Sequence, residues 1–213
     1  MNSDEKYRFP PKQETLLLIS IYLLGCIFIL TPQTNILSPK VISTTFSFAF
    51  YNILFLISWI DMKTFLISNN LLSLGFILGG IVFLIRVYDL QFNTKVESFL
   101  YLVIESLICF AIIFLVNKVG QYLVQVNLLG IGDAKLASMC TIWIGGEGIF
   151  SALMIAFLTA GFFSLCKNII KNTTRYAPIP FAPFISGGVW CVWITGSNSW
   201  WNYLQDLFGY LMV

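Results

Sequence analysis

The sequence predicts an all-α integral-membrane protein, a polytopic bundle of about six to seven transmembrane helices with a C-terminal interfacial helix. The chain is 58% hydrophobic and only 10% charged, whereas a soluble domain carries about 25% charged residues. Apolar stretches recur at roughly the 20-residue length that crosses a bilayer. These stretches are continuously apolar rather than alternating, which excludes a transmembrane β-barrel.

The chain is expected to form one membrane domain over residues 1–213. Its first part, 1–14, is polar, and no cleavable signal peptide stands out there. The transmembrane core covers 15–196. The tail, 197–213, places tryptophan and leucine side chains on one helical face, so it is predicted to lie in the membrane interface.

Prolines, glycines and charged residues separate the apolar stretches. The predicted spans are 15–30, 41–60, 65–87, 98–116, 136–144, 149–166 and 181–196. A mildly polar loop is predicted over 119–129 and a basic loop over 167–180. The run 136–144 is short for a full span at about 1.5 Å per residue. Either the membrane is locally thin there, or the helix starts below the lipid surface with Asp133 near its N-terminus.

The positions of the basic residues predict the orientation. If the N-terminus is cytoplasmic and seven segments alternate, nine Lys and Arg residues lie inside and three outside, which fits the positive-inside rule. The inside set is Lys6, Arg8, Lys12, Lys63, Lys118, Lys135, Lys167, Lys171 and Arg175, and the outside set is Lys40, Arg86 and Lys95. The same alternation places Asp61 and Asp133 together on the cytoplasmic face of a multi-pass protein of the cell (inner) membrane.

Several kinds of chemistry lack the residues they need. The chain has no histidine, and no two of its five cysteines form a C-x-x-C motif. Zinc coordination and a histidine-dependent triad therefore have almost no ligands, and no metal or cofactor is expected. The net charge of +2 is too small to suggest nucleic-acid binding. Carboxylates are left as the candidate acid–base groups.

Asp133 lies in Gly130-Ile131-Gly132-Asp133, between two apolar segments, where an acid is expensive without a partner or a task. It could cap a helix that begins at Ala134. Alternatively, the two glycines allow an extended peptide to approach the carboxylate closely. Asp61, at the end of another apolar run, could equally be an ordinary acid at a helix end. Two adjacent carboxylates on one face, however, can share a proton and act as a coupled acid–base pair.

Three further charged residues allow more than one interpretation. Lys63 and Lys135 each follow one of the aspartates by two positions. They either anchor lipid headgroups and set the topology or attract an acidic residue of a substrate. Glu105 lies within an apolar segment and should face the bundle interior. It could tune the site or bond to a neighbouring Ser or Asn, and it is not predicted to be catalytic.

Four blocks, in order along the chain, resemble the type IV prepilin peptidases, a GxGD class of membrane aspartyl proteases. They are Arg8-Phe9-Pro10 with Glu14, Asp61-Met62-Lys63 with Ile67 and Asn69, Gly130-Ile131-Gly132-Asp133-Ala134-Lys135-Leu136, and Ile179-Pro180-Phe181-Ala182-Pro183-Phe184. The resemblance implies that Asp61 and Asp133 form the catalytic pair. It also implies a prepilin or pseudopilin substrate, whose short basic leader is cleaved after a glycine on the cytoplasmic side. The proline-rich block is implied to be structural.

The chain departs from the family pattern in three places. Ser68 and Ala182 stand where proline and glycine are usual, and the four-cysteine motif of the methyltransferase part is absent. The resemblance therefore implies peptidase activity only, and N-methylation is either done by a separate enzyme or not done. Two other classes stay open at this stage. One is a small membrane transporter with intramembrane acids, and the other is a non-catalytic pilus-assembly protein.

Overall fold

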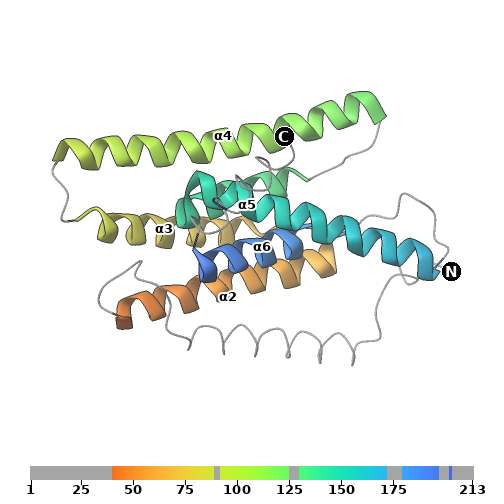
Figure 1. The fold of residues 1–213 in the computed structure, drawn as a ribbon, viewed down its shortest axis with the longest axis horizontal. Coiled ribbons are helices and arrows are strands. Elements are labelled where there is room, and N and C mark those ends of the chain that lie inside the picture. Colours follow the sequence, from red (N-terminus) through yellow and green to blue (C-terminus); the bar gives the residue numbers. More distant parts are fainter. Residues whose placement is uncertain (1–39, 89–91, 125–129, 172–178, 197–201, 203–213) are drawn as a thin grey trace. The chain divides into compact units, whose positions relative to one another are not determined.

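The computed structural model describes residues 40–88, 92–124, 130–171, 179–196 and 202. The described residues are almost entirely helical and contain no strand, as Figure 1 shows. The helices are α2 (Lys40–Thr64), α3 (Asn69–Arg86), α4 (Phe92–Val124), α5 (Ile131–Lys171) and α6 (Ala182–Thr195). The all-α prediction is therefore confirmed for this part of the chain. The predicted segments 1–14 and 15–30, and the interfacial tail except Asn202, lie outside it.

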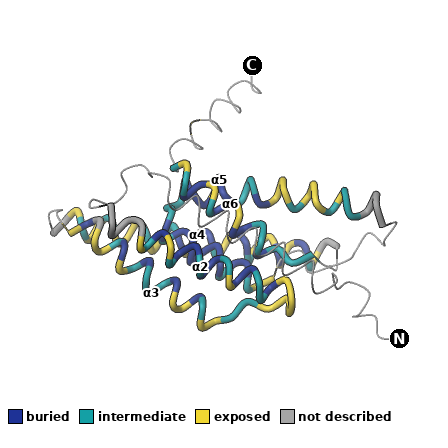
Figure 2. The backbone as a smooth tube through the Cα atoms, turned by 90° about the horizontal axis from the view of Figure 1, so that it is seen from below, coloured by how far each residue is buried: buried dark blue, intermediate teal, exposed yellow. Residues whose placement is uncertain are grey.

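The chain divides into two compact units, Met1–Tyr51 and Asn52–Val213. The C-terminal part of α2 and helices α3 to α6 belong to the second unit, which also contains both aspartates. Within this unit, α5 packs against α3, α4 and α6. Most of the buried residues lie on α2, α5 and α6 (Figure 2).

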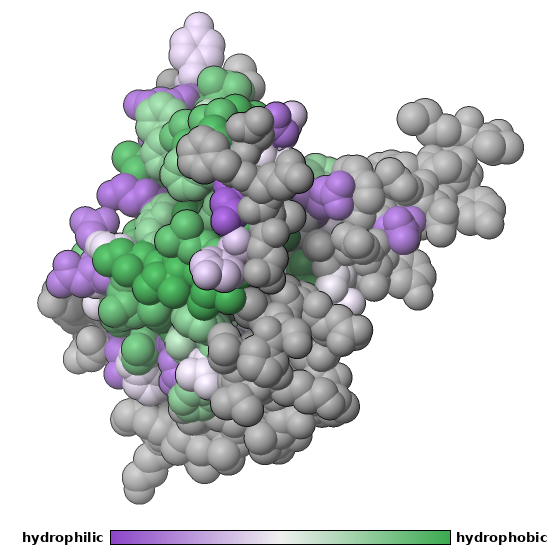
Figure 3. Space-filling view, turned by 90° about the vertical axis from the view of Figure 1, so that its left-hand side faces the viewer, coloured by the Kyte–Doolittle hydropathy of each residue, from purple (hydrophilic) through white to green (hydrophobic). Residues whose placement is uncertain are grey.

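The surface is apolar in the way that a bilayer requires. Many large hydrophobic side chains are exposed, and Figure 3 shows them as a broad green area on one face. Three helices of the described residues are long and apolar enough to cross a membrane: Thr45–Thr64, Thr94–Tyr122 and Ile131–Lys167. Asn69–Ile85 and Ala182–Thr195 are shorter apolar helices. These lengths and compositions identify a membrane protein, but they do not establish the predicted six to seven spans.

Helices α3, α4 and α5 begin or end at positions that differ from the predicted spans. Residues 65–68 are a loop, so α3 starts at Asn69. Helix α4 continues to Val124, so the loop predicted over 119–129 was wrong for 119–124. Glutamine has a good helix propensity, so polar residues there need not end the helix. Residues 167–171 also remain helical rather than starting the basic loop.

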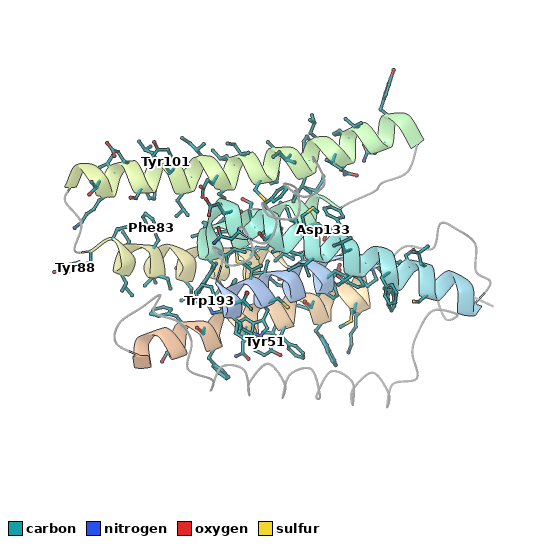
Figure 4. The ribbon with its side chains drawn as sticks, viewed as in Figure 1. Tyr51, Phe83, Tyr88, Tyr101, Asp133 and Trp193 are labelled. Atoms are coloured by element: carbon teal, nitrogen blue, oxygen red, sulfur yellow. The ribbon has the colours of Figure 1, made fainter. Side chains whose placement is uncertain are left out.

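Helix α5 joins the two predicted spans 136–144 and 149–166 across a sharp break at Gly145, where φ is 75° and ψ is 172°. The contacts of α6 show how the two halves run. Trp193 lies near the end of α6, where Figure 4 labels it. It packs edge-on against Trp143, just before the break, with ring centroids 5.9 Å apart. Phe181, just before α6, packs against Phe157, with centroids 5.2 Å apart. The second half of α5 therefore runs antiparallel to α6.

Glu105 of α4 stabilises the break in α5. Its Oε2 accepts the backbone N–H of Gly146 at 2.9 Å. Gly146 begins the second half of α5, where backbone N–H groups lack partners within the helix. The expected Ser or Asn partner of Glu105 is therefore a backbone amide instead, and Glu105 acts as a helix cap supplied by another helix.

Replacing Glu105 tests this capping role. Glu105→Ala should lower stability by about 1–3 kcal/mol, because it leaves a partly buried N–H unsatisfied. Glu105→Gln should be much closer to wild type, since its amide oxygen can accept the same bond. Thermal unfolding in detergent measures the difference, and equal losses in both variants would contradict the assignment.

Candidate active site

Asp61 lies in the last turn of α2 and is 5% exposed. Its Oδ2 accepts the backbone N–H of Ala182, the first residue of α6, at 3.1 Å. The N-terminus of a helix carries a partial positive charge, so this position stabilises a carboxylate. Pro180 and Pro183 flank this helix start, where proline is well tolerated because the N–H groups have no partner within the helix. The proline-rich block thus presents a backbone donor to Asp61.

The loop after Asp61 has an unusual backbone. Phe65 donates its N–H to the Asp61 carbonyl at 2.8 Å, closing α2 with a single bond from the residue beyond its end. Its φ is 55°, a conformation usually left to glycine at this position. A side chain there costs roughly 1–2 kcal/mol. The chain accepts this strain four residues after Asp61, and the turn leads directly to Ile67.

Asp133 is the third residue of α5 and is 8% exposed. Its Oδ2 accepts the N–H of Gly130 at 2.9 Å. The helix starts at Ile131, not at Ala134, so Asp133 is not the N-cap. Its side chain instead reaches back from the first turn to the backbone N–H of Gly130, the residue just before the helix, as the acid of a capping box does. The capping interpretation was correct in kind, but the position of the helix start was wrong.

The two motif glycines have separate steric roles. A Cβ on Gly132 would lie 3.2 Å from three side-chain atoms of Ile67. A Cβ on Gly130 would lie 3.3 Å from Asp133 Oδ2. Gly132 therefore makes room for the loop that follows Asp61, and Gly130 lets the Asp133 carboxylate fold back onto the chain. The close approach predicted at Gly132 is made by this chain's own loop.

A substitution at Gly132 should push this loop away. Gly132→Val is expected to reduce stability by about 1–3 kcal/mol through overpacking. Adding Ile67→Ala should restore much of the lost stability, because it removes the side chain that clashes. Gly161→Val is the control, since nothing lies within 4 Å of a Cβ there. Thermal unfolding in detergent measures the effects, and failure of Ile67→Ala to restore stability would contradict this packing.

The two carboxylates come from different helices of the second unit, Asp61 from α2 and Asp133 from α5. They are near enough to interact electrostatically. Each uses one oxygen to accept a backbone N–H. Among the described residues, neither side chain's second oxygen accepts a hydrogen bond. No group of three or more potential metal-ligating His, Cys, Asp or Glu side chains occurs in the described ranges. The arrangement is a pair of buried acids with one oxygen each left for other partners.

The two predicted lysines lie differently from each other. Lys63 is exposed, and its ammonium lies 4.2 Å from the ring centroid of Trp59, one turn earlier on α2. Lys135 donates to Asn69 Oδ1 at 3.1 Å, linking α5 to the start of α3.

The backbone N–H of Ala182, which donates to Asp61, was not predicted as part of the site. A backbone amide leaves no side-chain signature, and only the prolines around 182 marked the position.

The fold and the site together define a helical membrane protein with a buried pair of aspartates at helix ends. Residues 48–165 match the type IV leader peptidase family, so the chain belongs to that family. No solved structure matches the chain significantly.

Curated relatives support the same family. A protein named prepilin leader peptidase/N-methyltransferase from Aeromonas hydrophila is 26% identical over 156 residues, covering 72% of this chain and 50% of the relative. The protein of the same name from Aeromonas salmonicida strain A449 is 26% identical over 157 residues, covering 73% and 50%. One from Xanthomonas campestris pv. campestris is 30% identical over 77 residues, covering 36% and 27%. The chain thus spans about half the length of the two Aeromonas relatives.

Proposed function

We propose that this chain is a membrane aspartic endopeptidase that removes the basic leader from type IV prepilin or pseudopilin-like precursors. In this proposal the reaction takes place at the cytoplasmic face of the inner membrane. The observation that carries it is the pair Asp61 and Asp133, both buried, each with one oxygen held by a backbone N–H. Family membership and the names of the relatives favour a prepilin substrate.

The pair can cleave a peptide bond by general acid–base catalysis. Two adjacent carboxylates do not readily ionise together, so they share one proton. The protonated acid polarises the scissile carbonyl, and the ionised one takes a proton from water, which attacks the carbonyl carbon. The tetrahedral intermediate then collapses, the C–N bond breaks, and the leaving amine receives a proton from the pair. The balance of protons requires no metal and no histidine.

The neighbouring residues shape this site. Gly130 and Gly132 allow the close packing around Asp133. Lys63, exposed beside the end of α2, is placed to attract an acidic residue of a substrate from outside the pair. Lys135 is bonded to Asn69 and forms part of the α3–α5 contact. The proposal covers the peptidase reaction only. The relatives are also named N-methyltransferases, but this sequence does not contain the four-cysteine motif of the methyltransferase part.

Co-expression with a prepilin tests the proposal. Mass spectrometry of the pilin should show loss of the leader only when this chain is present, with no methyl group added by this chain alone. Expressing the pilin without the chain controls for processing by the host. If several prepilins stay intact beside a folded, membrane-inserted chain, a non-catalytic role in pilus assembly replaces this proposal.

A further inference from the structure

A groove lies between α3 and α4, with α5 as its floor. Its volume is about 570 Å³, and its lining includes Asn69, Phe76 and Ile77 of α3, Leu107 and Phe110 of α4, and Lys135 of α5. Phe83 and Phe99 join α3 to α4 near the opposite end of α3, with ring centroids 6.2 Å apart. The groove therefore runs along the helices from the end that carries Lys135 and Asn69.

The groove is polar at one end and apolar along its length. Lys135 and Asn69 lie near the helix starts, and Lys135 Nζ bonds to Asn69 Oδ1 at 3.1 Å. Within the described residues, the Lys135 ammonium forms no ion pair. About two turns farther along α3, Ile77 is 64% exposed, and Leu107 across the groove is 61% exposed. A lysine ammonium without an ion-pair partner among the described residues thus lies at one end of an open apolar groove.

The groove and the aspartate pair lie on different sides of α5. Successive residues of a helix are about 100° apart, so Lys135 projects roughly 200° away from Asp133. Asp133 folds back onto Gly130 and interacts with Asp61, whereas Lys135 points to α3. A molecule in the groove is therefore not aligned with the proposed cleavage site, which disfavours a scissile peptide as its occupant.

We propose that this groove is a binding site for one anionic phospholipid. Its phosphate pairs with the Lys135 ammonium and accepts from the Asn69 amide, and one acyl chain lies along Phe76, Ile77 and Leu107. Basic pockets between transmembrane helices bind anionic headgroups in this way. An apolar groove with a cation at one end matches a lipid, in which a charged headgroup is joined to hydrocarbon chains. The proposal does not depend on peptidase activity.

Native mass spectrometry of the purified full chain tests the site. Phosphatidylglycerol and phosphatidylcholine with identical acyl chains are the probes. The wild type should retain phosphatidylglycerol in preference to phosphatidylcholine. Lys135→Ala should reduce that preference about fivefold, the effect of one lysine beside an anionic headgroup. Lys135→Arg should keep it, and Leu107→Trp should reduce the binding of both lipids by filling the groove.

Lys118→Ala is the matched control, because Lys118 is an exposed lysine near the same end of α4 whose ammonium lies over Phe114 rather than in the groove. It should leave lipid retention unchanged. Equal effects of Lys118→Ala and Lys135→Ala, or no lipid preference in the wild type, would overturn the proposal. So would displacement of the lipid by a prepilin peptide or by millimolar inorganic phosphate. Bound lipid is read by mass, so each of these failures leaves the peptidase proposal untouched.

Discussion

Asp133→Asn should abolish leader cleavage while leaving the protein folded. Asparagine has the same shape, and its amide oxygen can still accept the Gly130 N–H that Asp133 Oδ2 accepts at 2.9 Å. It cannot take or give a proton, so the pair loses its shared proton. Losing an acid–base group of this kind lowers rates by about 10²–10⁴-fold. Cleavage of a purified prepilin, followed by mass spectrometry, measures the loss.

Asp61→Asn should have a similar effect, because the two acids act as one unit. Combining the two substitutions should therefore add little to either one. Glu97→Gln is the matched carboxylate-to-amide control, since Glu97 is exposed near the start of α4. It should cleave at the wild-type rate. If either aspartate variant keeps that rate and remains folded, the pair is not the catalytic centre.

Gly188→Ala should be the most damaging small substitution outside the pair. A Cβ at this position of α6 would lie 2.4 Å from the backbone oxygen of Ala152 on α5. A backbone atom cannot rotate away, so the two helices have to separate. Small residues commonly allow transmembrane helices to approach this closely. Overpacking of this kind costs about 1–3 kcal/mol, and the shift also moves the Ala182 amide away from Asp61.

The neighbouring glycine provides the control. Gly187 is exposed, and a Cβ there meets nothing within 4 Å. Gly187→Ala should be neutral or stabilising by up to about 1 kcal/mol, because alanine favours the helix. Thermal unfolding in detergent and prepilin cleavage should both separate the two variants. Equal behaviour would mean that the α5–α6 contact does not limit either property.

Much of the helical pattern was predictable from the sequence. Spans and breaks follow from apolar runs ended by charged residues, glycines and prolines, and the break at Gly145 falls within the Gly145-Gly146 signal between two predicted spans. The ends were harder to predict. Polar residues such as Gln121 led to the prediction of a loop, yet α4 continues through them to Val124. A helix end depends on whether the next turn finds tertiary contacts, which local composition does not encode.

The choice of Asp61 and Asp133 as site candidates came from the sequence, through topology and the lack of histidine. Their surroundings did not. The N–H of Ala182 reaches Asp61 from the start of α6, and the side chain of Ile67 packs beside Gly132 from the loop after α2; both positions depend on how α2, α5 and α6 pack. Neither contact has a side-chain pattern of its own. The sequence therefore nominated the two acids as candidates, whereas their backbone donors and steric neighbours required the three-dimensional fold.

The bond between Asp61 and Ala182 also has a consequence for biosynthesis. The two residues are 121 positions apart in the chain, and α6 is the last of the labelled helices. Asp61 therefore leaves the ribosome and enters the membrane well before its backbone donor has been translated. Until then, Asp61 in the nascent protein lacks its backbone donor. The ribosome must finish α6 before the polypeptide can adopt the arrangement seen around Asp61.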